Sequence, residues 1–467
     1  MAEAIPRVSS QTDLTTGPYG KLPVLARELK NPDEHKISPL EEMRINVDKV
    51  PIIHLWMAQG QAEVFGAELS TDRIYTFLKG SKISIWSWTG CTIMIEGKPK
   101  ILKTKDSRVT TIHFNFHNCL EQHREVAVKN DVVGPRILVL GNANSGRSVF
   151  CRLLLNYAAR MRGDDRRNPI FVDLDFIQPD LAVPGTIACC QFDRPTDPMF
   201  DYYYYRKFVL PYGYLNTDPE TNPNSESNLE LLHSQIRKLG AVIEKKFDND
   251  RRARHSGAII NCFSVVKEYS YSHIFVIAKA FRVNFIVVLG NKWMVDELQN
   301  HPSRQDLEPD LQVISMPKAQ DIVESTQEER RLHREARIRH NIYGHPLRSP
   351  KHRPFKHEVE FSDILLCKLG NPAINKALLP ENVDLVRVKT AAYPLQLKEV
   401  NYLVDHILYI TNVDTAEKVA SEGSVIGYLL VKGVTASAQS KKLTLLSNFE
   451  TLPKKVLLTS AIQLKDS

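Results

Sequence analysis

The chain has 467 residues, enough for two or three domains with sizeable cores, and its 43% hydrophobic and 25% charged residues are typical of a globular protein. The net charge of +7 is mild: a solvated surface explains it as well as any partner does, although it would suit proximity to RNA. Seven cysteines without a CxxC pair argue against a zinc module or a disulfide framework. The N-terminus lacks the apolar core of a signal peptide, and no apolar run approaches about eighteen residues. We therefore expect a protein that is neither secreted nor membrane-spanning.

The first zone, residues 1–130, is predicted to be a β-rich domain. It begins with a polar segment rich in Pro, Gly and Thr that we expect to be mobile up to about residue 40. Short runs rich in β-branched and aromatic residues then alternate with glycines, at 62–65, 74–78, 83–88 and 91–95. Strands at this spacing, with turns between them, favour a small β-sandwich.

A phosphate-binding loop opens the second zone, with one residue out of pattern. It reads Gly141-Asn142-Ala143-Asn144-Ser145-Gly146-Arg147, followed by Ser148. An apolar run at 136–140 predicts the strand before it, and apolar side chains at three- and four-residue steps from 150 to 161 predict the helix after it. A glycine-bearing turn in any α/β protein is the alternative, but strand, loop and helix stand in the order that phosphate binding requires.

The irregularity is Arg147, which stands where the pattern has a lysine. A P-loop lysine reaches the β and γ phosphates, while the Ser/Thr hydroxyl after it binds Mg²⁺. Guanidinium is a planar fork with five donors, bulkier than an ammonium group. We therefore expect Arg147 to bind phosphate without following the migrating γ-phosphoryl group as a lysine would.

The rest of the second zone, residues 131–345, predicts a parallel sheet covered by helices. Apolar runs at 169–174, 257–262, 284–289 and 311–315 alternate with helical stretches. A polar stretch at 212–227 is interpreted as a loop over the site or a surface excursion. The segment 324–340 has helical propensity and carries five arginines; on spacing alone a solvated helix face is the favoured explanation. The arginines are Arg330, Arg331, Arg334, Arg337 and Arg339.

Two aspartates end the second strand of this zone. Asp173 and Asp175 are expected at the carboxyl edge of the sheet, beside the phosphate loop, where Mg²⁺ bound to a nucleotide needs a carboxylate. Asp173 is the preferred site residue. For Asp175 the alternative is a structural role, either capping a helix or pairing with an arginine.

The third zone, residues 346–467, opens with a linker rich in Pro, Arg and Lys. Strand-like runs at 364–366, 385–388, 425–431 and 443–446 predict a compact mixed domain without visible chemistry. The predicted fold class is therefore α/β: a central P-loop NTPase domain with a parallel sheet, flanked by an N-terminal β-sandwich and a small C-terminal mixed α/β domain.

Several further segments resemble landmarks of one family, in the order in which the family has them. They are residues 62–69, 88–91, 171–175, 183–187, 253–257 and 338–344. On these segments and the loop, the chain resembles the polynucleotide 5′-hydroxyl kinase family that includes the ATP-binding subunit of pre-mRNA cleavage factor IA. The resemblance covers almost the whole chain.

The resemblance implies that ATP and Mg²⁺ bind between the first two domains. Glu42 and Lys82 would reach the nucleotide from the sandwich, and Ser148 and Asp173 would hold Mg²⁺. The arginine segment would be the lid, with Arg334 and Arg339 approaching phosphate. The loop residues implied to bind the nucleotide are Asn144, Ser145, Gly146, Arg147, Ser148 and Val149.

Three departures from the family pattern affect catalysis. Arg147 replaces lysine, Val265 stands where active members have a tryptophan that clasps the terminal nucleotide, and Ile177 replaces a glycine. A valine cannot provide the aromatic face on which a base stacks. The departures favour a protein that keeps its nucleotide without turning it over.

The preferred hypothesis is thus a non-catalytic, ATP-holding scaffold subunit of the nuclear pre-mRNA cleavage machinery. Its implied partners are subunits of cleavage factor IA, chiefly the one that contacts the polymerase C-terminal tail, and contact with pre-mRNA is left open. The alternative is an active kinase that transfers the γ-phosphoryl group of ATP to the 5′-hydroxyl of RNA or DNA. Its catalytic residues would be Arg147, Asp173, Arg334 and Arg339.

Overall fold

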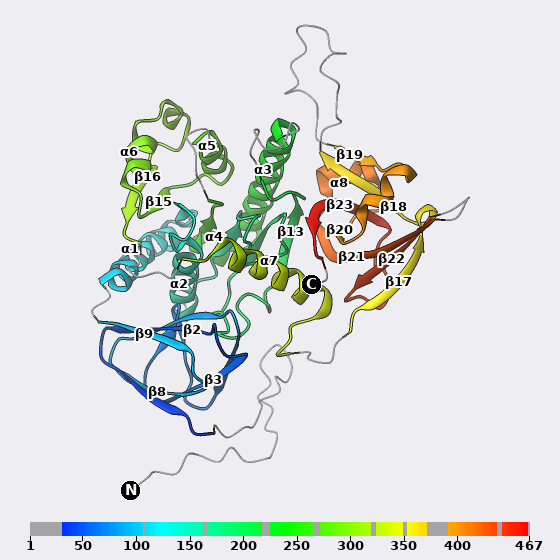
Figure 1. The fold of residues 1–467 in the computed structure, drawn as a ribbon. Coiled ribbons are helices and arrows are strands. Elements are labelled where there is room, and N and C mark those ends of the chain that lie inside the picture. The colour runs from blue at the N-terminus through cyan, green and yellow to red at the C-terminus, as the bar shows by residue number, and fades with distance from the viewer. Residues whose placement is uncertain are drawn as a thin grey trace.

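The computed structural model describes most of the chain in nine segments (Figure 1). The segments are residues 30–105, 108–161, 166–216, 225–264, 271–318, 324–348, 353–370, 391–436 and 441–465. Two sequence-based predictions fall outside them: the strand at 385–388 and the clasp position Val265. The segment expected to be mobile up to about residue 40 lies outside them as far as residue 29, whereas Asp33–Ile37 form a strand, β1. About half of the polar stretch at 212–227 also lies outside them.

The N-terminal domain is the predicted β-sandwich. One sheet has the order β1-β8-β3-β6 and the other β5-β4-β7-β2-β9. Side chains alternate between the buried interior and a half-exposed face along β8, as expected for a strand with one face on the core. The strands are β1 (Asp33–Ile37), β2 (Glu41–Asn46), β3 (Ile52–Gly60), β4 (Glu63–Val64), β5 (Ala67–Glu68), β6 (Ile74–Leu78), β7 (Lys82–Ser87), β8 (Cys91–Glu96) and β9 (Lys100–Lys105).

The central sheet has the order β13-β12-β11-β14-β10-β15-β16, and it is mixed where the sequence predicted a parallel sheet. The five strands from β11 to β16 are parallel, whereas β12 and β13 run antiparallel at one edge. Positive φ at Gly185 turns the chain back before β12, so no crossover helix is needed. The strands are β10 (Arg136–Gly141), β11 (Ile170–Asp173), β12 (Thr186–Gln191), β13 (Lys207–Pro211), β14 (Ala258–Asn261), β15 (Phe285–Leu289) and β16 (Gln312–Met316).

Helices cover this sheet, and one of them, α1, links it to the sandwich that precedes it in the chain. Phe116 and Leu120 of α1 lie in the hydrophobic core of the central domain. The helix packs against α2 and α4. The helices are α1 (Arg108–Asn130), α2 (Arg147–Arg160), α3 (Ser225–Asn249), α4 (Arg251–Ser256), α5 (Tyr271–Ala280), α6 (Lys292–Asn300), the 3₁₀ helix η3 (Pro302–Asp306) and α7 (Gln327–Tyr343).

The C-terminal domain is built on a third sheet, of order β17-β22-β21-β20-β23-β18-β19. It packs on the central domain through Tyr409, whose hydroxyl donates to the backbone oxygens of Pro184 (3.3 Å) and Gly185 (3.4 Å). Its elements are β17 (Phe355–Glu360), η4 (Phe361–Asp363), β18 (Leu365–Gly370), β19 (Ala391–Pro394), η7 (Leu397–Leu403), β20 (His406–Thr411), α8 (Ala416–Glu422), β21 (Val425–Ala436), β22 (Lys441–Ser447) and β23 (Val456–Gln463).

In Figure 1 the sandwich and the C-terminal domain lie on two different sides of the central domain, and α7 runs across the middle of the molecule. Among the described residues, no helix is long and apolar enough to cross a membrane.

Candidate nucleotide site

A large cleft of about 1650 Å³ opens where the sandwich, the phosphate loop and α7 meet. The sandwich contributes the turn between β6 and β7, the central domain contributes residues 143–149, and α7 contributes residues between 327 and 341. All six loop residues predicted to bind the nucleotide, 144–149, line this cleft. The cleft is therefore shared between the two domains between which the resemblance implies that the nucleotide binds.

The phosphate loop has the backbone that an anion requires. Asn144 and Gly146 have φ of 60° and 90°, and Gly146 caps α2 without any side-chain hydrogen bond to the helix N-terminus. The first N–H groups of α2 are thus left for a ligand, at the end of the helix where the dipole favours negative charge. The buried hydroxyl of Ser145 also has no hydrogen-bond partner among the described residues. These groups fit the phosphates of a nucleotide.

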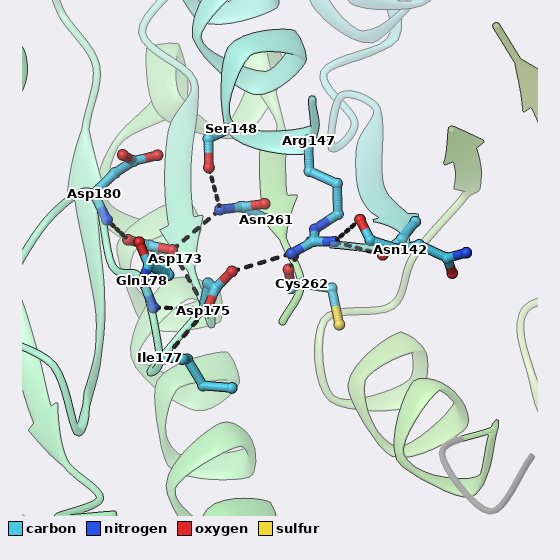
Figure 2. Close-up of polar contacts among 11 residues, drawn as sticks. Asn142, Arg147, Ser148, Asp173, Asp175, Ile177, Gln178, Asp180, Asn261 and Cys262 are labelled. Carbon is cyan, nitrogen blue, oxygen red and sulfur yellow. Dashed lines mark hydrogen bonds and ion pairs between the residues drawn. The ribbon is translucent and has the colours of Figure 1, made fainter. Parts of the chain in front are cut away.

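Arg147 is buried, and the protein itself takes up most of its donors. Its Nε donates to the backbone oxygen of Cys262 (3.0 Å), and one Nη donates to the backbone oxygens of Gly141 and Asn142, the latter at 2.8 Å. The other Nη donates to Asp175 Oδ2 at 3.1 Å. Figure 2 shows the side chain extending from the start of α2 toward these acceptors. Arg147 therefore joins the phosphate loop to the ends of β11 and β14.

Asp175 takes the structural role that the sequence left open for it. Its Oδ1 accepts from the backbone N–H groups of Ile177 (3.2 Å) and Gln178 (3.0 Å), while Oδ2 pairs with Arg147. Ile177 packs against the central core and is not among the residues with positive φ. An ordinary turn held by Asp175 stands where the family has a glycine.

Asp173 and Ser148 are brought together through Asn261 at the end of β14 (Figure 2). The Asn261 amide donates to Ser148 Oγ and to Asp173 Oδ1, both at 3.3 Å. Oδ2 of Asp173 accepts from the backbone N–H groups of Asp180 (2.6 Å) and Leu181 (3.0 Å). The sequence reasoning missed Asn261, although a polar residue ending an apolar strand beside the loop could have indicated it.

Burial, together with the negative charges of Asp180 and Asp175, raises the pKa of Asp173 to about 8. The raised pKa favours the protonated carboxyl group. A bound divalent cation would favour the carboxylate instead, because its positive charge stabilises the negative charge. No group of three or more His, Cys, Asp or Glu side chains in the described part of the chain could hold a metal alone. Mg²⁺ is commonly held by one or two protein oxygens together with nucleotide phosphates and water, and Ser148 with Asp173 fits that pattern.

The two residues predicted on the sandwich side differ in their placement. Lys82 lines the cleft and reaches the lid helix, donating to Ser325 Oγ (3.1 Å) and Glu329 Oε2 (3.3 Å). Glu42 is buried on β2, where Arg44 binds both its oxygens (2.9 and 3.0 Å), and it is not among the residues that line the cleft. The structure therefore brings Lys82 to the site and leaves Glu42 outside it.

The lid brings to the cleft one of the two arginines that the resemblance selected. Arg330, Arg331, Arg334 and Arg337 are among the lining residues, whereas Arg339 is not. Arg339 lies about 140° from Arg334 around the helix. The structure therefore places Arg334 at the cleft and does not place Arg339 there.

Two further cations in the cleft were missed by the sequence reasoning. Arg152 of α2 pairs with Asp201 (2.7 Å) and lies over the rings of Phe65 and Tyr202. Lys207 begins the antiparallel strand β13, which no apolar alternation had marked. Its ammonium group has no hydrogen bond or ion pair with another described residue. Burial, and to a smaller extent the charge of Arg337, lowers the pKa of Lys207 to about 8.

Replacing Lys207 with methionine is expected to raise the free energy of unfolding of the nucleotide-free protein at pH 7 by about 1 to 3 kcal/mol. The reason is the lowered pKa: between pH 8 and 10.5 the unfolded chain binds the proton that the folded chain has lost, so stability rises with pH there. The gain from the substitution should therefore shrink above pH 8 and vanish near pH 10.5. Urea denaturation across this range measures it.

Lys238 is a matched control, because the pKa of its ammonium group is also lowered by burial to about 8. It donates to the backbone oxygens of Gly423 (2.7 Å) and Ala420 (3.4 Å), so Lys238→Met should destabilise the protein. Equal effects of the two substitutions would contradict the inference that the buried ammonium group of Lys207, unlike that of Lys238, lacks compensating hydrogen bonds.

Three family models match consecutive parts of the chain. Residues 36–127 match the N-terminal beta-sandwich domain of polyadenylation factor. Residues 141–344 match the mRNA cleavage and polyadenylation factor CLP1 P-loop, and residues 353–466 match pre-mRNA cleavage complex II protein Clp1.

Relatives cover nearly the whole chain. It is 32% identical over 426 residues to polyribonucleotide 5′-hydroxyl-kinase Clp1 of Gallus gallus (91% of this chain, 95% of that protein). It is 31% identical to the Homo sapiens protein of the same name over the same shares of both chains. A solved wild-type Clp1p–Pcf11p complex matches its fold with a TM-score of 0.77 at 20% identity, covering 92% of this chain and 98% of that chain.

Proposed function

This chain belongs to the Clp1 family of mRNA cleavage and polyadenylation factors, and we propose that within it the protein is a non-catalytic, ATP-holding scaffold subunit. The observation that carries the proposal is the placement of Arg147. Its guanidinium is bound to three backbone oxygens and to Asp175, so the cation at the position of the P-loop lysine ties the loop to its own sheet and is not free to follow the γ-phosphoryl group.

The residues that would hold the nucleotide are favourably placed. The N–H groups of the loop and of the α2 N-terminus would bind the phosphates, and Ser148 with Asp173 would hold Mg²⁺. Lys82 would contact the nucleotide from the sandwich while it binds the lid helix. A bound nucleotide would then join the sandwich, the central domain and the lid.

The proposed partner and location are supported by the similar solved structures and by the family. One similar solved structure is a Clp1p–Pcf11p complex, and a second contains an extended interface between Pcf11p and Clp1p. We infer that this chain, too, binds the cleavage-factor subunit that contacts the polymerase tail, and that it works in the nucleus.

A phosphoryl-transfer assay tests the non-catalytic part of the proposal. Purified protein is given γ-labelled ATP, Mg²⁺ and a 5′-hydroxyl oligonucleotide. We expect no labelled product above that of the Asp173→Ala variant. Product above this control would support the second candidate function, a polynucleotide 5′-hydroxyl kinase. The Gallus gallus and Homo sapiens relatives are named for this activity.

The kinase candidate also has a structural argument in its favour. Arg334, Arg337 and Lys207 bring three positive charges to the cleft beside the loop, enough to neutralise a transferring phosphoryl group. If the assay is positive, the loss of activity in Lys207→Met and in Arg334→Ala would show which cation replaces the missing lysine.

A further inference from the structure

A second cavity, of about 370 Å³, lies where the central domain, the end of the lid helix and the C-terminal domain meet. Strand β21 of the C-terminal domain packs there against both β13 and α7 (Figure 1). We name the space between residues 207–209 of β13, Asn341 of α7 and residues 424–426 at the start of β21 the junction cavity. Three parts of the fold thus build one cavity outside the phosphate loop.

Most of the wall of the junction cavity is apolar. Val209 and Val425 are buried, whereas Ile426 is 42% exposed and lies where the cavity meets solvent. The ring of Tyr428 also lines the cavity, and its hydroxyl group is already hydrogen-bonded within the central domain. A ligand with an apolar body would bury its surface against these side chains.

One charge stands in this apolar wall. Among the described residues that line the junction cavity, Lys207 is the one charged side chain. Its ammonium group has no hydrogen bond or ion pair with another described residue. Burial lowers the pKa of Lys207 to about 8, so the group is still charged at pH 7. A buried cation without a partner is costly, and a negative charge placed beside it would offset that cost.

The donors of the junction cavity suit a single negative charge. Lys207 offers its ammonium group and Ser424 its hydroxyl group, whereas the amide of Asn341 already donates to the backbone oxygen of Arg337 (2.9 Å). A phosphate group carries roughly two negative charges at pH 7 and presents three strong acceptor oxygens. A carboxylate has one charge and two oxygens, so it matches one ammonium group and one hydroxyl group.

We propose that the junction cavity binds a small monocarboxylate with an apolar body, whose carboxylate is held by Lys207 and Ser424. The volume of the cavity is in the range of small-molecule sites. An acidic segment of a protein fits less well, because it would bring unpaired backbone polar groups into an apolar cavity. Such a ligand would contact the central domain, the lid helix and the C-terminal domain at once. The proposal does not depend on the scaffold function.

The test titrates the full chain with sodium octanoate in a calorimeter, with ATP and Mg²⁺ present. We expect saturable binding that Lys207→Met weakens about 10- to 100-fold, the usual effect of losing a hydrogen bond to a charged group. This variant should fold, because removing the unpaired charge is expected to stabilise the protein. Ile426→Trp, which changes no charge, should weaken octanoate binding about 5- to 100-fold by taking up volume in the cavity.

Arg334→Ala is the matched control, because Arg334 lines the nucleotide cleft and not the junction cavity, whereas Lys207 lines both. It should leave the affinity for octanoate near that of the wild type. Equal losses in Arg334→Ala and Lys207→Met would place the anion in the nucleotide cleft and overturn the proposal. So would an absence of saturable binding, an unchanged affinity in Ile426→Trp, or displacement of octanoate by an equal concentration of inorganic phosphate.

Discussion

Replacing Arg147 with methionine is expected to lower the free energy of unfolding by about 3 to 5 kcal/mol, the usual cost of breaking a buried ion pair by removing one partner. Asp175 would remain buried without its cation, and the backbone oxygens of Cys262, Gly141 and Asn142 would lose their donor. Methionine fills part of the volume, so the loss of charge and hydrogen bonds is the main change. Urea denaturation of the nucleotide-free protein measures the difference.

Arg331→Ala is the matched control on the lid helix. Arg331 pairs with Glu328 and Glu335 on the exposed surface of α7, and surface pairs of this kind contribute about 0 to 1 kcal/mol. If Arg147→Met costs no more than Arg331→Ala, then Arg147 is not the structural tie inferred from its contacts. Arg147→Lys should fall between the two, because an ammonium group has three donors and cannot span Cys262 and Asp175 together.

Much of the fold could be predicted because buried strands have a clear sequence signal. The runs at 136–140 and 284–289 are apolar throughout, since both faces of a central parallel strand are covered. The sequence patterns did not predict β12 and β13, for a physical reason. These strands form an antiparallel edge, contain polar positions at their ends and have no preceding helix. The packing of α1 on the central domain depends on tertiary contacts of Phe116 and Leu120, which no local pattern reports.

The candidate site was predictable where a motif sets the geometry and unpredictable where long-range contacts decide. The loop residues and Asp173 follow from strand, loop and helix order. The partner of Arg147 does not, because Asp175 reaches it only through the pairing of β11 with β14 and of β14 with β10. Arg337 is a different case: it lies three residues after Arg334, so helical spacing could have indicated it together with Arg334, although the sequence analysis selected Arg339.

ATP with Mg²⁺ is expected to raise the free energy of unfolding by about 4 kcal/mol when its free concentration is a thousand times its dissociation constant. The stabilisation arises by mass action, because the site is assembled from the sandwich, the phosphate loop and the lid and exists only in the folded chain. Denaturation at increasing ATP, together with extraction of nucleotide from the purified protein, measures it. A protein that is purified empty and that ATP does not stabilise would refute the scaffold proposal.

Lys82→Ala should remove part of this ATP-dependent stabilisation, because Lys82 is a side chain of the sandwich that binds the lid directly, through Ser325 and Glu329. Without ATP the substitution should cost little, since the pair with Glu329 is partly exposed. Lys36→Ala is the control: Lys36 forms a surface pair with Glu34 on β1, away from the cleft, and should leave the ATP response unchanged. A loss of stability in Lys82→Ala that does not depend on ATP would mean that Lys82 supports the domain interface itself and not the nucleotide. Comparing the free energies of unfolding of the two variants, with and without ATP, therefore distinguishes two cases. In the first the nucleotide joins the sandwich to the lid, and in the second Lys82 joins them without it.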